Sequence, residues 1–386
     1  EPAFQKLLTS VETQQARDRD LRPLRVLALS ATNRGNAPAF KLSEQDLNDS
    51  RIRQRIHAAK RLVPHLIDDE KKQLTEKLVA LALSHRDSNR AVLIFARSLE
   101  IVQRVVTELE KTKVSPTPVS LTGTLRGWER DRLVEHPAFQ RFLPPSSRVS
   151  IVEPIPTGTV YLVATSAGEV GVNLSADDLI CDLSTFESMA QRFGRVNRFG
   201  ELSDTVIDVV YPTSFDEKDP LSPPRKRTFD LLGQLQGNAS PFALSELDPT
   251  AREAAFSPEP TILPATDILF DAWSLTTIRE RLPGRPTVEA YLHGIAEWEP
   301  SETRVAWRGE VMLIDESLIP IHPPEELLAD YPLKPHELLR DRSSRVHEQI
   351  KKLARRGEIA RLRVWLLNED GTVVPKTLGD LAEKEA

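Results

Sequence analysis

The chain has 386 residues, 28% of them charged, and a formal net charge of −6, which fits a globular protein of two or three domains. The acidic balance excludes a broadly cationic nucleic-acid surface, so any such contact must lie in a local groove. No apolar run of about 18 residues predicts a membrane helix. The single cysteine, Cys181, excludes an internal disulfide framework and a thiolate metal cluster.

The sequence opens on Glu1 without an initiator methionine or the basic-then-apolar pattern of a signal peptide. We therefore expect a piece of a longer cytoplasmic protein. The first predicted elements are a polar helix over 7–19, a short strand over 25–29 and an irregular linker over 36–49. From 50 to about 83 the apolar spacing predicts a helix that Pro64 kinks or divides.

Strands then alternate with helices. Strands are predicted at 91–95, 118–121, 159–164, 179–183 and 205–211, and helices at 99–110, 127–134 and 187–197, with a loop at 140–158. Short apolar strands separated by helices predict a parallel α/β sheet with helices on both faces. After Pro212 we expect an accessory region with helices near 226–236, 265–282 and 336–356, and a hairpin over 362–374 that turns on 369–371.

The strongest motif is the octapeptide from Gln191 to Arg198, on the last helix of the sheet region. Gln191, Arg195 and Arg198 are spaced i, i+4 and i+7, which predicts that they share one helix face. Arginines offer permanently charged, bidentate donors to a phosphate. The alternative is a solvated basic face, although such faces rarely also carry a glutamine and a helix-breaking glycine in register.

A second motif follows strand 159–164. Thr165 and Ser166 offer hydroxyls and amides to a nucleic-acid phosphate, and Gly171 and Asn173 are candidates to face a ribose. Alone, this motif is weak, because many strand-to-loop turns look similar.

Three other strand ends are polar or basic. They are Ser30-Ala31-Thr32, the segment that ends in Ser98, and Gly123 followed by Arg130. Ligands of open α/β sheets bind at the carboxyl ends of the strands, so these ends together predict a coherent site. The alternatives are helix capping for Ser30 to Thr32, and a charged surface helix around Arg130.

These pieces, in this order, resemble the superfamily 2 helicases of the DExH type. Ser30, Ala31 and Thr32 match motif III, which couples ATP hydrolysis to strand movement, and residues 95–98 match motif IV. Residues 165–173 match motif V, which implies a nucleic-acid contact at Thr165. Residues 191–198 match motif VI, which implies that Arg195 and Arg198 reach the γ-phosphate of ATP. Asn173 departs from the pattern, because these helicases usually have Asp there; its carbonyl can still accept a ribose hydroxyl.

More narrowly, the chain resembles the CRISPR-associated helicase of type I systems, in the subtype formerly labelled U. Residues 191–200 and 331–342 carry this resemblance, and the first eight residues look like the helix after a DExH box. It implies four parts: the end of a first RecA-like lobe (1–35), an interlobe linker (36–49), a second RecA-like lobe (50–212) and an α+β accessory region (213–386). It also implies an ATP-dependent helicase that acts on single-stranded DNA at a CRISPR surveillance complex, with a histidine–aspartate nuclease in cis or in trans.

The chain contains neither the Gly-x-x-x-x-Gly-Lys-Ser/Thr phosphate loop nor an Asp-Glu-x-His box. We therefore expect a first lobe upstream of Glu1 that holds most of the ATP and the Mg²⁺, and a fragment that is inactive alone. The eight histidines lack metal-ligand spacing, so no metal or nuclease site is expected. Two other interpretations remain open: an RNA-remodelling superfamily 2 helicase, and a non-catalytic nucleic-acid-binding adaptor.

Overall fold

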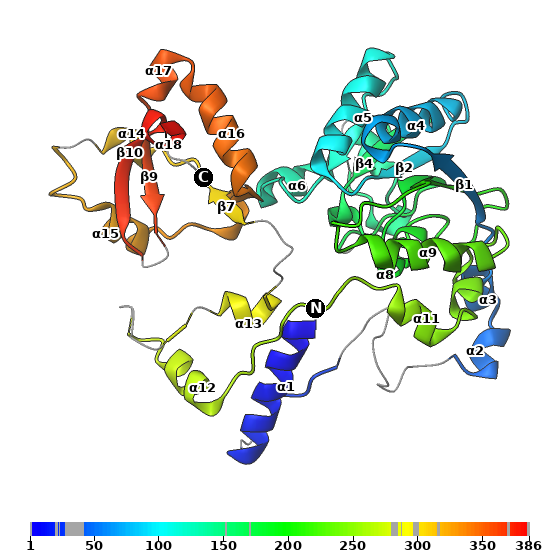
Figure 1. Cartoon of the computed structure of the whole chain (residues 1–386), viewed down its shortest axis with the longest axis horizontal. Helices are drawn as coiled ribbons and strands as arrows, with labels where there is room; N and C mark the ends of the chain where they lie inside the picture. The colour runs from blue at the N-terminus through cyan, green and yellow to red at the C-terminus, as the bar shows by residue number, and fades with distance from the viewer. Residues whose placement is uncertain are drawn as a thin grey trace. The chain divides into compact units, whose positions relative to one another are not determined.

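The computed structural model describes residues 2–19, 22, 24–27, 42–150, 153–169, 171–278, 285–286, 288–295, 301–314, 317–368 and 371–383. They fall into two compact units (Figure 1). One unit joins Glu1–Leu29 to Glu259–Ala386, and the other is Ser30–Pro258. The predicted coupling residues Ser30, Ala31 and Thr32 lie outside the described residues. Of the strand expected over 25–29, residues 25–27 are described, and they are irregular.

The second unit is built on a six-stranded parallel sheet in the order β1-β6-β5-β2-β4-β3. Its strands are β1 (Arg61–Ile67), β2 (Ala91–Phe95), β3 (Val119–Leu121), β4 (Val160–Ala164), β5 (Asp178–Asp182) and β6 (Val206–Pro212). The central strands β2, β4 and β5 are buried along their whole length, as expected of a sheet covered on both faces. The predicted RecA-like α/β fold is confirmed.

Two apolar layers flank the sheet. On one face, α4 (Glu70–Ser84) and α5 (Leu99–Lys111) bury Leu74, Leu78, Val102 and Val105. The other face is covered by α7 (Pro137–Gln140), α8 (Phe186–Phe193) and α9 (Ser222–Gln234). This layer continues into the segments around α10 (Pro241–Ser245) and α11 (Pro249–Ala254), where Ala255 and Phe256 are buried. The unit therefore runs past residue 212, where the sequence placed the end of the lobe.

The helix predicted from 50 to about 83 is wrong. After α2 (Glu44–Asn48), the chain forms the short α3 (Ser50–Ile56), then β1, then α4. Pro64 lies inside β1 instead of at a helix kink. Because β1 is an edge strand of the six-stranded sheet, a residue without an N–H is tolerated at Pro64. β1 shows no alternation with a period of two residues: Leu62 and Ile67 are buried and the residues between them are more exposed, so the apolar pattern contains no strand signal here.

The other unit contains helices and two antiparallel strand pairs. The paired strands are β7 (Glu302–Val305) with β8 (Leu339–Arg342), and β9 (Arg363–Leu367) with β10 (Val373–Thr377). The second pair is the predicted hairpin. Its helices are α1 (Pro2–Arg17), α12 (Asp267–Ser274), α13 (Glu289–His293), α14 (Glu310–Leu313), α15 (Pro324–Asp330), α16 (Ser343–Ala354), α17 (Gly357–Ala360) and α18 (Leu378–Glu383).

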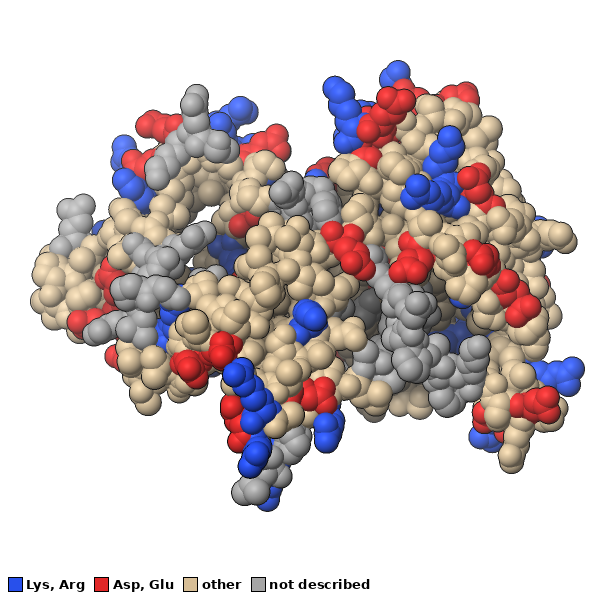
Figure 2. All heavy atoms as spheres, turned by 60° about the horizontal axis from the view of Figure 1, so that its bottom comes forward, with Lys and Arg blue, Asp and Glu red and all other residues tan. Residues whose placement is uncertain are grey.

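The surface carries interspersed charges. Figure 2 shows acidic and basic side chains mixed over the face that it presents, without a broad area of one sign. Within the described ranges, every helix is too short or too polar to span a lipid bilayer.

A histidine–aspartate cluster ties α4 to the sheet. His85, at the carboxyl end of α4, places Nδ1 3.4 Å from Asp178 Oδ2 and Nε2 3.8 Å from Asp208 Oδ2. Asp208 Oδ1 is also 2.6 Å from Nε2 of His65 on β1. The hydrogen bonds to Asp178 and Asp208 raise the pKa of His85 to about 9. At neutral pH the ring is therefore a partly buried cation that holds two carboxylates together.

We predict that the unit loses stability as the pH rises. An unfolded histidine titrates near 6.5, so the contribution of protonated His85 is complete below pH 6.5 and is lost by about pH 9. The shift corresponds to at most about 3 kcal/mol. In urea unfolding, the free energy of unfolding of His85→Gln should fall less steeply between pH 6.5 and 9 than that of the wild type. The exposed His322→Gln is the matched control, and equal slopes for wild type and His85→Gln would contradict the prediction.

Candidate functional site

Arg195 and Arg198 lie on a turn beyond the end of α8. The helix ends at Phe193 with Gly194 as its C-cap, so the prediction that Gln191, Arg195 and Arg198 share a helix face is wrong. Lys60 Nζ donates to the carbonyl of Phe193 at 2.7 Å, which satisfies a free carbonyl at the helix end. Burial and the nearby charge of Arg198 lower the pKa of Lys60 to about 8.

The turn that carries the arginines is fixed by Asn197. Its φ is +41°, a left-handed conformation that asparagine tolerates, and its side chain is buried. Asn197 Nδ2 donates to the carbonyls of Ala59 at 3.0 Å and Leu202 at 2.7 Å, and Oδ1 accepts from the N–H of Leu202 at 3.1 Å. Sequence reasoning missed this residue, although an asparagine beside a glycine-flanked turn is a signal for it.

The two arginines are not equivalent. Arg195 is half-buried and donates to the carbonyls of Glu169, at 2.9 Å through Nε, and of Val172, at 2.6 Å through Nη1. Arg198 is exposed, and its Nη1 donates to Oδ1 of Asn173 at 3.0 Å. Arg195 therefore holds the motif V loop, while Arg198 keeps further N–H donors directed at solvent. Of the two, Arg198 is the more accessible to a ligand.

Asn173 is exposed and lies between two polar partners. Besides accepting from Arg198, it donates through Nδ2 to Oγ of Ser147 at 3.0 Å. Gly171 precedes it with a φ of +82°, which favours glycine. The structure thus brings Gly171, Asn173 and Arg198, three predicted nucleotide-contacting residues, into one segment of surface.

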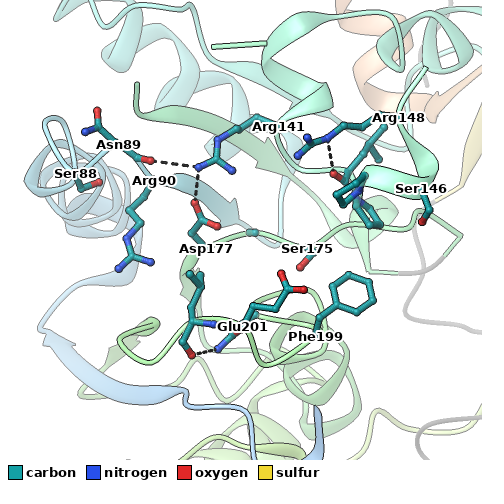
Figure 3. Close-up of a pocket in the computed structure, with 16 residues that line it drawn as sticks. Ser88, Asn89, Arg90, Arg141, Ser146, Arg148, Ser175, Asp177, Phe199 and Glu201 are labelled. Atoms are coloured by element: carbon teal, nitrogen blue, oxygen red, sulfur yellow. Dashed lines mark hydrogen bonds and ion pairs between the residues drawn. The ribbon is translucent and has the colours of Figure 1, made fainter. Parts of the chain in front are cut away.

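A cavity of about 710 Å³ adjoins the arginine turn and shares Ser175 and Asn197 with it (Figure 3). Arg141 on its wall donates to Asp177 Oδ2 at 3.1 Å, and Figure 3 shows these two side chains pointing toward one another. The sequence analysis did not predict this cavity. Its residues come from separate loops: Ser88, Asn89, Arg90, Arg141, Leu143, Pro144, Pro145, Ser146, Arg148, Ser175, Ala176, Asp177, Asn197, Phe199, Glu201 and Leu202.

The predicted nucleic-acid residues gather at the carboxyl edge of the sheet. Hydrogen bonds from Ala96 N to Ala164 O and from Thr165 N to Leu121 O place the ends of β2, β4 and β3 side by side. Ser166 is exposed just after β4.

The residues that follow β2 and β3 belong to this edge as well. Ser98 Oγ accepts from the N–H of Ile101 at 3.3 Å and caps α5, so its hydroxyl hydrogen remains for another partner. Gly123 is exposed after β3, with open space where a Cβ would stand, and the exposed Arg130 follows on α6 (Gly127–Leu133).

The arginine turn lies at the opposite edge. Val196 forms a bridge with Ala176, two residues before β5 begins, so the turn is at the amino end of that strand. Residues 165–176 connect the two edges, because they run from the end of β4 to the start of β5. The candidate residues therefore form two surfaces joined by the motif V segment.

The two surfaces are linked through a buried arginine. Arg192, in the last turn of α8, is 1% exposed. Its Nε donates to Glu169 Oε1 at 2.8 Å, and its Nη1 donates to Asp182 Oδ1 at 3.0 Å. Asp182 in turn lies 3.1 Å from Arg97 Nε, and Arg97 Nη2 lies 2.6 Å from Glu70 Oε1. Motifs IV, V and VI thus share one chain of ion pairs.

We predict that Arg192→Met destabilises the unit strongly. Removing the guanidinium leaves the carboxylates of Glu169 and Asp182 buried without their cation, which costs about 3 to 5 kcal/mol. Urea unfolding measures this cost. The double variant Arg192→Met with Glu169→Gln should recover part of the loss, because one stranded charge is removed. A loss below about 1 kcal/mol for the single variant would refute this role.

Several solved structures are similar to this chain. A structure of T. fusca Cas3 with ATP is 19% identical, over 51% of this chain and 24% of that chain, with a TM-score of 0.36. This chain therefore spans about a quarter of that Cas3 chain. A crystal structure of a CRISPR-associated protein is 15% identical over 97% of this chain and 49% of that one, with a TM-score of 0.46.

The C-terminal domain of the DEAD-box protein Dbp5 is 18% identical, over 41% of this chain and 79% of that chain, with a TM-score of 0.31. A search of curated proteins finds no match. At these identities the solved structures transfer no residue role to this chain.

The family comparison covers the centre of the sheet unit. Residues 88–201 match the model described as CRISPR-associated nuclease/helicase Cas3, C-terminal. This segment begins just before β2 and ends after the arginine turn, so it contains both candidate surfaces. The resemblance to a CRISPR-associated helicase is confirmed over residues 88–201, which are similar to the C-terminal part of the Cas3 nuclease/helicase family.

Proposed function

We propose that the chain is part of an ATP-dependent translocase that acts on single-stranded DNA in CRISPR defence. Residues 50–212 would form the core of the second RecA-like lobe, after a linker at 36–49 and the end of the first lobe at 1–35. The observation that carries the proposal is the pairing of Arg198 with Asn173 inside the segment that matches the Cas3 model. Residues 213–386 would add to the lobe and supply an accessory region.

The nucleotide would lie at the arginine turn. Arg198 has unused N–H donors and is exposed, so it fits the terminal phosphate of ATP, and Asn173 offers its side-chain amide to the ribose. Arg195 holds the loop between them through the Glu169 and Val172 carbonyls. The chain contains no phosphate-loop motif, so the first lobe would hold Mg²⁺ and most of the nucleotide. Arg198 would then stabilise charge as the phosphoryl group departs.

Single-stranded DNA would cross the carboxyl edge of the sheet. Thr165 and Ser166 follow β4, Gly123 follows β3, and Ser98 and Arg130 lie on the neighbouring segments. Hydroxyls and one exposed guanidinium suit contacts to the phosphate backbone, which do not depend on base sequence. Such local contacts are compatible with the acidic net charge of the chain. A CRISPR surveillance complex would deliver the strand, and a histidine–aspartate nuclease in cis or in trans would cut it.

We predict that Arg198→Ala in a protein containing both lobes lowers kcat for ATP hydrolysis by about 10³-fold or more, because the γ-phosphate loses its cation. Arg198→Lys should recover little, since a single ammonium cannot match the guanidinium fork. The matched control is Arg361→Ala, an exposed arginine of the other unit. DNA-stimulated ATP hydrolysis at wild-type rate in Arg198→Ala would rule out this role.

The RNA-remodelling alternative makes a different prediction about the same enzyme. Stimulation of ATP hydrolysis by single-stranded DNA and not by RNA of the same sequence supports the DNA translocase. The reverse preference supports RNA remodelling. A protein that binds strand but hydrolyses no ATP, even with the first lobe present, is the non-catalytic adaptor.

A further inference from the structure

Trp128 is an exposed aromatic residue that none of the motifs explains. It lies on α6 and is 51% exposed. The guanidinium carbon of Arg132, one helical turn further on, lies 4.3 Å from the centroid of its ring. An indole of this exposure is not needed for the core, since Leu121 and the residues after it pack without it. The stacked pair of Trp128 and Arg132 is therefore a rigid, flat, positively charged surface feature.

Its position in the fold points to nucleic acid. α6 begins six residues after β3 ends, and the connecting segment contains Thr122 and Gly123. The end of β3 is bonded to the segment that follows β4, through the N–H of Thr165 and the carbonyl of Leu121. The tryptophan thus stands on the helix that follows the carboxyl edge proposed above to bind the phosphates of a single strand.

Exposed charges of both signs lie beside the indole on α6, namely Arg130, Arg132 and the carboxylate of Asp131. Arg130 and Arg132 are exposed, whereas Arg126 pairs with Glu129 at 2.7 Å. The exposed guanidinium groups of Arg130 and Arg132 suit the phosphates next to a stacked base. An aromatic ring accepts any of the bases by stacking, because every base has a π-face.

We propose that Trp128, with Arg132 stacked on it, is a base-stacking platform for single-stranded nucleic acid at the carboxyl edge of the sheet. This inference rests on the proposed function, because it places the strand on that edge. It adds a contact to the bases, whereas Ser98, Thr165 and Ser166 would contact only the backbone. The platform would hold one nucleotide of the strand without reading its identity.

The test compares two strands of equal length and charge: oligothymidylate and an abasic oligonucleotide. Fluorescence anisotropy of labelled strands measures the affinity of the full chain for each. Trp128→Ala should weaken binding of oligothymidylate about 10-fold and leave the abasic strand unchanged, because only the former has bases to stack. Trp128→Phe should recover most of the loss.

Two variants separate stacking from other effects. Arg130→Ala should weaken both strands equally, because it removes a phosphate contact. Trp307→Ala, a 62% exposed tryptophan of the other unit, should change neither affinity. Thermal unfolding of Trp128→Ala checks that α6 and the sheet remain folded.

The outcomes distinguish this inference from the proposed function. Unchanged affinity of Trp128→Ala for oligothymidylate, or an equal loss for both strands, overturns the platform while the phosphate path stands. Wild-type chain that binds neither strand overturns both. A loss confined to oligothymidylate and rescued by phenylalanine establishes the platform.

Discussion

The buried guanidinium of Arg192 is the interaction on which the site depends. A cation without access to water is costly, and here it is tolerated because Glu169 and Asp182 surround it with carboxylate oxygens at 2.8 and 3.0 Å. Glu169 belongs to the loop after β4, Asp182 ends β5, and Arg192 is on α8. Each element is thus fixed relative to the other two by charge, whereas apolar packing alone would allow them to slide.

This constraint joins the two candidate surfaces at opposite edges of the sheet. The segment after β4 leaves the carboxyl edge at Thr165, passes Glu169 at the ion pair, and reaches the amino edge at Asn173. Arg195 binds the carbonyl of the same Glu169. A displacement of the segment at one edge must therefore strain contacts with Arg192 and Arg195 at the other. The two candidate surfaces are therefore joined by a segment that both Arg192 and Arg195 contact at Glu169.

The sequence predicted the sheet well and the first part of the unit badly, for a physical reason. Strands such as 91–95 are buried on both faces, so their apolar runs are unbroken and easy to identify. β1 is an edge strand with a proline, and its half-buried pattern also fits a helix over a short window. Only the pairing of β1 with β6, more than 140 residues further along the chain, decides between them.

The same is true of the candidate site: its residue types can be read from the local sequence, whereas its geometry depends on residues far along the chain. The residue types in the octapeptide 191–198 predict a phosphate-binding motif, which stays a prediction, and the family match includes this segment. Its geometry was not predictable, because the helix ends where Lys60, a distant residue, takes the carbonyl of Phe193. The structural role of Arg192 was equally hidden, since a charged residue among apolar ones in α8 reveals its partners only when the sheet is assembled.

The conformation of the turn that carries Arg198 also depends on the segment of the chain that precedes β1. The carbonyl of Ala59 accepts from Asn197, Lys60 binds the end of α8, and Gln54 Nε2 on α3 donates to the carbonyl of Gly200 at 3.1 Å. A side chain at Gly200 would place its Cβ 2.2 Å from the carbonyl oxygen of Gln54, so the approach admits only glycine. The segment that enters the unit therefore acts on the turn directly. The position of this segment therefore affects that of Arg198 through direct hydrogen bonds, and not through the apolar core of the sheet.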